Sequence, residues 1–154
     1  MTRRDVHRLL AFDHWASTQV LDAVEPMAAQ VPRAVDWLAH VVAAKRIWFA
    51  RVTDTAMPFA VNPTMTPAEI RAQLQVAHDE WSGYLGGLTD ADLPRVVHYT
   101  NLKGAPFHST LEDILTHLAI HGQQHRGQAN AAIRQAGGAP PVIDYIHASR
   151  SGAV

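Results

Sequence analysis

Apolar residues recur every three or four positions along four stretches of this chain, which is the spacing of one face of an α-helix. The first stretch runs from about Arg3 to Val24. The second begins near Trp37 and ends before Pro58, and prolines at positions 26 and 32 lie between the two stretches. Because proline interrupts helices, the pattern predicts two separate helices here.

Two short motifs mark the beginnings of two further helices. In Thr66-Pro67-Ala68-Glu69, threonine is a typical N-cap, proline suits the first helical position, and glutamate stands three residues after the cap. A third helix should follow and end around Gly86-Gly87. Ser109-Thr110-Leu111-Glu112 forms a second capping box. It opens a helix of about 28 residues, roughly 40 Å long, that ends at Gly137-Gly138.

Between residues 95 and 108 the pattern changes from helical to strand-like. Val96–Thr100 and Ala105–His108 flank the turn-like sequence Asn101–Gly104, which predicts a short hairpin with Pro106 at an edge. The chain shows no internal repeat. The sequence therefore predicts an all-α fold: a four-helix bundle formed as one domain over residues 1–154, with a short β-hairpin before the last helix. The long segments before the third and fourth helices permit crossover connections.

The composition is that of a globular domain, with 154 residues, 47% of them hydrophobic and 18% charged. A formal net charge of −1 gives no electrostatic footprint for nucleic acid or an anionic membrane. No stretch approaches the roughly 20 apolar residues that span a bilayer, and charges stand where a signal peptide needs apolar residues. We therefore expect a cytoplasmic protein that binds neither nucleic acid nor membrane.

The chain contains no cysteine. Disulfides, thiolate ligands and a cysteine nucleophile are therefore excluded. Any metal must be held by nitrogen and oxygen, and any sulfur chemistry requires an external thiol.

His121 and His125 lie four residues apart in the predicted last helix, on one face of it. Both fall within the apolar stripe or at its edge, so they point inward. Burying a polar ring without a partner costs roughly 1–3 kcal/mol, and one metal ion would satisfy both rings. Core histidines bonded to backbone or water, or histidines on a solvated face, are the alternatives. The intervening Gly-Gln-Gln lacks the glutamate of HExxH, which disfavours a peptidase.

A metal site inside a bundle takes ligands from facing helices, so a third donor should come from another helix. His40, at the edge of the apolar stripe of the second helix, is the best candidate; its alternative is a bond to a backbone carbonyl at the surface. His117, one turn before His121, should flank the site rather than ligate. Three neutral imidazoles leave one coordination position free, which is typical of a catalytic ion. Zinc suits three histidines, and nickel or iron would add waters.

Several segments spread over nearly the whole chain resemble one known family. The most specific is His125-Arg-Gly-Gln128 within a histidine-bearing helix. The others are Phe12–Ala16, His40 with Trp48 eight residues later, Asn101–Phe107 and Gly137–Tyr145. Together they resemble the DinB (DNA-damage-inducible) family of metal-dependent four-helix-bundle proteins, which is distinct from the DNA polymerase of that name.

The resemblance implies that one histidine of the second helix and two of the last helix are metal ligands, which here are His40, His121 and His125. It implies a homodimer, and for the better understood relatives thiol-dependent transferase or isomerase chemistry. In that chemistry a divalent metal activates a low-molecular-weight thiol, which attacks a small electrophilic substrate. The alternatives are a non-catalytic stress-response bundle with a structural metal, and a metal-assisted hydrolase, for which no carboxylate is obviously placed as base.

Two carboxylates have expected roles beside this site. Asp13 stands where relatives often have asparagine, and it can contact a ligand histidine from the bundle interior. Arg126, expected on the rim of the last helix, should pair with a carboxylate, and Asp144 is the candidate.

Overall fold

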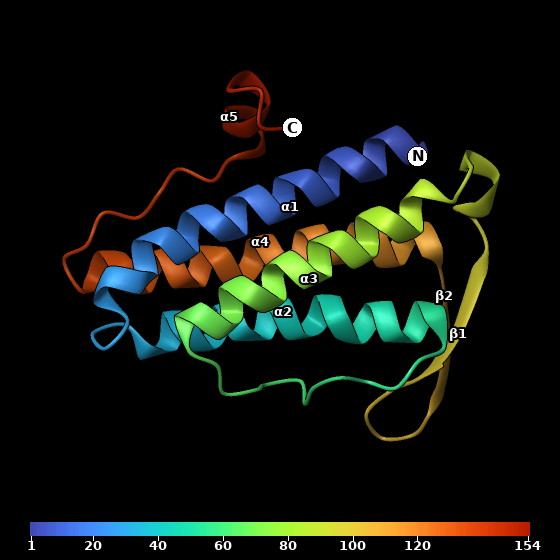
Figure 1. Ribbon diagram of the computed structural model, residues 1–154, viewed down its shortest axis with the longest axis horizontal. Helices are drawn as coiled ribbons and strands as arrows, with labels where there is room; N and C mark the ends of the chain where they lie inside the picture. The colour runs from blue at the N-terminus through green and yellow to red at the C-terminus, as the bar shows by residue number, and fades with distance from the viewer.

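The computed structural model describes residues 1–154 and contains four long helices, a hairpin and three short helical segments (Figure 1). The predicted all-α bundle with a hairpin before its last long helix is therefore confirmed. The elements are α1 (Arg3–Val24), η1 (Glu25–Met27), α2 (Pro32–Thr53), α3 (Pro67–Gly86), η2 (Asp90–Asp92), β1 (Val96–Thr100), β2 (Pro106–Thr110), α4 (Leu111–Gln135) and α5 (Tyr145–Arg150). None of the helices combines the length and apolarity needed to cross a bilayer.

The starts of the first three long helices follow from local chemistry. Thr2 caps α1 and Thr66 caps α3, each in a capping box closed by the acidic residue three positions later. Pro32 occupies the first helical position of α2, where a backbone N–H would have no partner within the helix, so the N–H that proline lacks is not needed. Helix α2 ends at Thr53, and its C-cap Asp54 has a φ of 54°, in the left-handed region that stops a helix.

Helix α4 begins and ends inside the predicted bounds. Its cap is Thr110, whose side chain accepts a hydrogen bond from the Asp113 N–H, and not Ser109. Ser109 still belongs to β2, because the hairpin extends two residues further than its sequence pattern indicates. The helix ends at Gln135, and Gly137, with a φ of 81°, turns the chain away.

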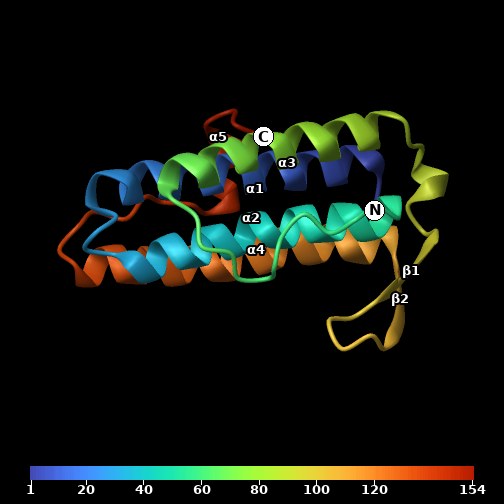
Figure 2. The ribbon, with the colours of Figure 1, turned by 60° about the horizontal axis from the view of Figure 1, so that its bottom comes forward.

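The four long helices form two layers, α1 with α3 and α2 with α4 (Figure 2). Helices α1 and α4 run one way and α2 and α3 the other, so residues 54–66 return along the length of the bundle (Figure 1). The hairpin, whose strands pair antiparallel with Val97 opposite Ser109, joins α3 to α4 at one end of the bundle. The predicted crossover is therefore the connection between α2 and α3, and it places α2 antiparallel to α4.

Helix α5 has no counterpart in the sequence prediction. It spans only six residues, too few for an apolar periodicity to be recognised. Tertiary contacts position it: the Tyr145 ring meets Phe12 of α1 edge-on at 5.3 Å, and Ala148 is buried.

The apolar core consists of two clusters at different levels of the bundle. One cluster of 16 buried residues includes Ala16 and Ala129, and the other, of 11, includes Leu10 and Leu118. Along α1 and α4, the residues between these levels include Asp13 and Arg126, both completely buried. A polar layer therefore separates the two halves of the core.

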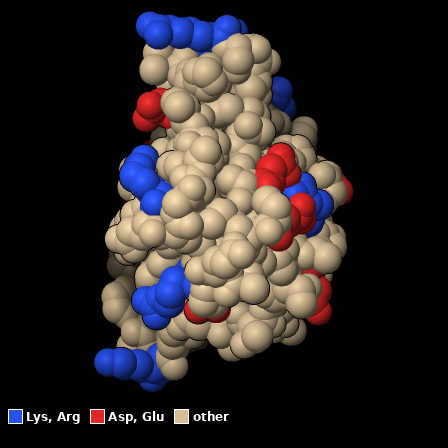
Figure 3. Space-filling view, turned by 90° about the vertical axis from the view of Figure 1, so that its left-hand side faces the viewer, with Lys and Arg blue, Asp and Glu red and all other residues tan.

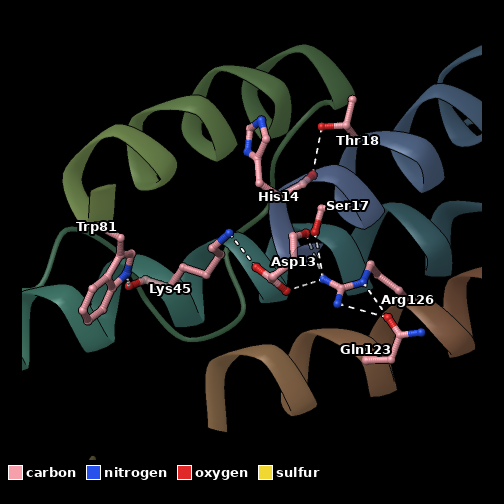
Figure 4. A network of polar contacts seen from close by, with 8 residues as sticks. All are labelled: Asp13, His14, Ser17, Thr18, Lys45, Trp81, Gln123 and Arg126. Atoms are coloured by element: carbon pink, nitrogen blue, oxygen red, sulfur yellow. Dashed lines mark hydrogen bonds and ion pairs between the residues drawn. The ribbon is translucent and has the colours of Figure 1, made fainter. Parts of the chain in front are cut away.

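This layer is a buried ion network that joins three helices (Figure 4). The Asp13 carboxylate of α1 pairs with Arg126 of α4, and its other oxygen lies 2.6 Å from Lys45 Nζ of α2. Arg126 also donates to Ser17 Oγ at 2.9 Å and to Gln123 Oε1. Burial alone would raise the pKa of Asp13, but the two cations outweigh it and hold that pKa below its usual value.

The network requires a glycine on α4. A Cβ at Gly122 would overlap Asp13 Oδ1 and would lie 2.7 Å from Arg126 Nη1. Neither side chain can move away without separating buried opposite charges. Gly127, on the same helix, has nothing within 4 Å of the corresponding position.

Gly122→Ala is expected to lower the free energy of unfolding by about 1–3 kcal/mol, because the methyl group separates Asp13 from Arg126. Gly127→Ala should instead raise it by up to about 1 kcal/mol through helix propensity. Urea unfolding followed by circular dichroism measures both. Equal effects of the two substitutions would contradict the close approach at Gly122.

A histidine pair lies beside the same layer, between α1 and α3. The rings of His14 and His78 are 4.2 Å apart, and His14 Nδ1 is buried without a hydrogen-bond partner. Burial, His78 and Lys45 together lower the pKa of His14 to about 4, from an ordinary value of 6.5. His14 is therefore neutral in the folded protein at neutral pH.

Between pH 6.5 and about 4 the unfolded chain binds a proton at His14 that the folded chain does not. The free energy of unfolding should therefore fall as the pH is lowered through this window, and His14→Gln should make that fall shallower. Denaturant titrations of the metal-free protein at several pH values measure the slope. His98→Gln, at an exposed hairpin position, is the control, and an unchanged slope in His14→Gln would refute the assignment.

Candidate metal centre

The structure brings the three predicted histidines together between two antiparallel helices. His40 projects from α2, and His121 and His125 project from successive turns of α4. His121 Nε2 lies 3.2 Å from His40 Nε2 and 3.1 Å from His125 Nε2. One nitrogen from each ring lies within 4.8 Å of the others, so the group can hold a metal ion. All three side chains are partly exposed, and ligands from solvent can reach them.

In two of the rings, the hydrogen-bond partner of the outer nitrogen determines which ring nitrogen carries the proton. His40 Nδ1 lies 2.9 Å from the Val61 carbonyl oxygen, and His125 Nδ1 lies 2.6 Å from Gln128 Oε1. Both partners are acceptors, so each Nδ1 must donate. In the neutral rings, both Nε2 atoms are therefore unprotonated and direct lone pairs toward His121.

Protons alone cannot satisfy this arrangement. His121 Nε2 can donate one hydrogen, to His40 or to His125, and the lone pair of the other ring is then left without a hydrogen to accept. A cation between the three nitrogens can accept a lone pair from each ring. The observed separations are close to the roughly 3.3 Å expected between two nitrogens bound tetrahedrally to zinc at about 2.0–2.1 Å. The donor set therefore fits a divalent ion.

Two of the three imidazoles favour the neutral form that binds metals. Burial, with His125 and His40 adding to it, lowers the pKa of His121 to about 4. Burial also lowers the pKa of His125, against an opposing effect of its bond to Gln128. Near neutral pH, no proton competes strongly with a cation at these two rings.

Aromatic rings flank the three histidines on both sides. Trp37, one turn before His40, stacks on His125 at 4.9 Å and an angle of 17°. On the other side the His117 ring lies 5.1 Å from His121 and meets Trp48 edge-on at 5.6 Å. His117 therefore lies beside the cluster and is not one of its three converging rings.

Two expectations about carboxylates are wrong. Asp13 contacts no histidine of the cluster, because Lys45 and Arg126 occupy its two oxygens. Arg126 is completely buried and not on a rim, and its partner is Asp13 rather than Asp144. Asp144 is exposed and precedes α5 at its N-cap position.

Sequence reasoning missed the groups that orient the rings. The carbonyl of Val61 lies in the crossover segment, and a backbone group leaves no signal in a sequence. The hydrogen bond between His125 and Gln128 could have been predicted from the sequence, since side chains three residues apart on a helix are neighbours. The stacking of Trp37 on His125 depends on how α2 packs against α4, which periodicity does not specify.

The fold and the site define a class of protein: a helical bundle with three converging histidines between two antiparallel helices. A family model described as the DinB superfamily matches residues 17–129, and the chain belongs to this superfamily. The predicted resemblance is thus confirmed. A similar solved structure is a DinB-like protein from Bacillus cereus, which is 17% identical over 81% of this chain and 91% of that chain, with a TM-score of 0.45. No curated protein matches the chain.

Proposed function

We propose that His40, His121 and His125 hold one divalent cation and that the protein is a metal-dependent enzyme transferring a small external thiol to an electrophilic substrate. The observation that supports cation binding most directly is the convergence of three Nε2 atoms, while the Nδ1 atoms of two of the rings are engaged by Val61 and Gln128. The choice of thiol chemistry follows from membership of the superfamily, since the resemblance implies this chemistry for its better understood members. The absence of cysteine agrees with a thiol supplied from outside.

A divalent ion held by neutral nitrogens acts as a Lewis acid and lowers the pKa of a thiol that it binds. The protein's own groups prepare the site for such a ligand. Val61 and Gln128 fix the orientation of two imidazoles, and the stacked Trp37 ring covers one face of His125. With neutral ligands, the positive charge of the cation is left for an anion to balance.

Other observations favour this proposal over its two alternatives. Helices α2 and α4 are already joined by the Asp13 network and by the apolar core, so the fold does not need an ion to hold them together. A structural metal is therefore disfavoured. No carboxylate forms a hydrogen bond or ion pair with any of the three histidines, which leaves metal-assisted hydrolysis without a general base at the cluster.

Zinc, nickel and iron remain candidates for the ion. Three imidazole nitrogens with an open position suit zinc in a tetrahedral site, and nickel or iron with added waters. Elemental analysis of the purified protein distinguishes them.

We predict close to one divalent ion per chain, lost on replacing any of the three histidines by alanine, since each supplies one of three nitrogen donors. Elemental analysis after dialysis measures the stoichiometry, and circular dichroism verifies that each variant, and the chelated protein, remains folded. His78→Ala, outside the cluster, should keep the ion. Full occupancy in His40→Ala would remove that residue from the site.

In the cobalt-substituted protein, a small thiol should produce a sulfur-to-metal absorption band and should add to an electrophilic acceptor faster than without protein. Because the thiolate is the bound form, affinity should strengthen as the pH rises toward the thiol pKa of about 8.5, until hydroxide competes. Absorption titration and an acceptor assay measure both effects, and the alanine variants should lose them together. An unchanged spectrum and no rate above the metal-free protein, for several thiols, would leave the structural-metal bundle as the better account.

A further inference from the structure

A pocket of about 330 Å³ lies at the first turns of α2. Helix α2 supplies one wall and the crossover segment between α2 and α3 supplies the other. The lining residues are Arg33, Asp36, Trp37, Asn62, Pro63 and Thr64.

The walls of this pocket are continuous with the groups that orient two of the three imidazoles. Trp37 lines the pocket and also stacks on His125 at 4.9 Å. Asn62 lines the pocket and directly follows Val61, whose carbonyl oxygen accepts from His40 Nδ1. The pocket and the histidine cluster therefore share Trp37 and the Val61–Asn62 segment as neighbours.

The pocket contains two opposite charges that are not paired. Arg33 and Asp36 are both exposed, and neither forms an ion pair or a side-chain hydrogen bond. They are three residues apart on α2, a spacing at which such side chains often pair. Instead, the guanidinium of Arg33 lies 5.3 Å from the centre of the Trp37 ring, an attraction that restricts its position while its N–H groups stay available.

The surrounding surface is not broadly basic. Figure 3 views the end of the bundle at which α2 begins, and the basic groups there form small separate clusters with uncharged surface and acidic groups between them. An anion attracted to this pocket would therefore be recognised by the single guanidinium beside Trp37 rather than by a general positive field.

We propose that this pocket binds the amino-acid end of the thiol, with a carboxylate at Arg33 and an ammonium group at Asp36, while the sulfur lies at the histidine cluster. Asn62 and Thr64 add neutral donors and acceptors beside the two charges. The inference rests on the proposed function and narrows its thiol to the zwitterionic, amino-acid or short-peptide class. Arg33 and Asp36 thus determine specificity; they make and break no covalent bond.

The test compares glutathione, which ends in an α-amino acid group, with 2-mercaptoethanol, which carries no charged group besides its thiol. Each is titrated into the cobalt-substituted protein while the sulfur-to-metal band is recorded. Glutathione should bind at least about tenfold more tightly, as charge-assisted hydrogen bonds would provide. Arg33→Gln should remove that advantage and leave 2-mercaptoethanol unchanged. Asp36→Asn should weaken glutathione but not 3-mercaptopropionate, which has no ammonium group.

Arg134→Gln is the matched control, because Arg134 is an exposed arginine in the last turn of α4 that forms no ion pair. It should bind both thiols as the unmodified protein does. Equal affinities for glutathione and 2-mercaptoethanol, or a glutathione advantage that persists in Arg33→Gln, would overturn the inference.

A second measurement separates this inference from the proposed function. S-methylglutathione keeps the amino-acid end but has no free thiol, and its binding to the metal-free protein is followed by the NMR shift of the Trp37 indole N–H. A saturable shift in the unmodified protein that disappears in Arg33→Gln supports the pocket even if no thiol alters the cobalt spectrum. No shift in the unmodified protein overturns the pocket, whatever the thiols do at the metal.

Discussion

A single carboxylate, that of Asp13, balances two cations in the middle of the bundle, and the positions of α1, α2 and α4 depend on it. Its partners Lys45 and Arg126 come from the two helices that also hold the histidine cluster. Removing one member of such a buried network leaves charge uncompensated, at a cost of about 3–5 kcal/mol. Apolar side chains can slide and repack more freely than paired charges, so the network fixes the relative positions of α2 and α4 along the bundle axis. The distances between the imidazoles on these two facing helices depend on those positions.

The charges of this layer and the chemistry of the cluster both favour a negatively charged ligand. The network contains two buried cations and one buried anion, so this buried layer carries one net positive charge. The neutral forms of His121 and His125 are favoured near pH 7, because burial lowers the pKa of both rings. A divalent ion among neutral ligands adds further positive charge. Both contributions favour an anionic ligand at the exposed side of the cluster.

Much of this arrangement was predictable from local pattern, and the parts that were not depend on distant segments. Helical periodicity and threonine caps gave the long helices, and the four-residue spacing of His121 and His125 placed both rings on one face. The partner of Arg126 was misassigned because Asp13 lies 113 residues away and nothing local links them. The Val61 carbonyl that orients His40 belongs to a segment without periodicity.

The contact between Val61 and His40 is made by the main chain, and this limits how the crossover segment can vary. Any residue at position 61 presents the same carbonyl oxygen, so substitutions there leave the hydrogen bond to His40 Nδ1 in place. An insertion or deletion between residues 54 and 66 shifts that oxygen along α2 and frees the ring to rotate. Among relatives, the length of this segment should therefore be more uniform than its sequence. A relative can therefore keep all three histidines and still lose the hydrogen bond that orients the one corresponding to His40. An alignment that compares only the three histidines would not reveal this loss.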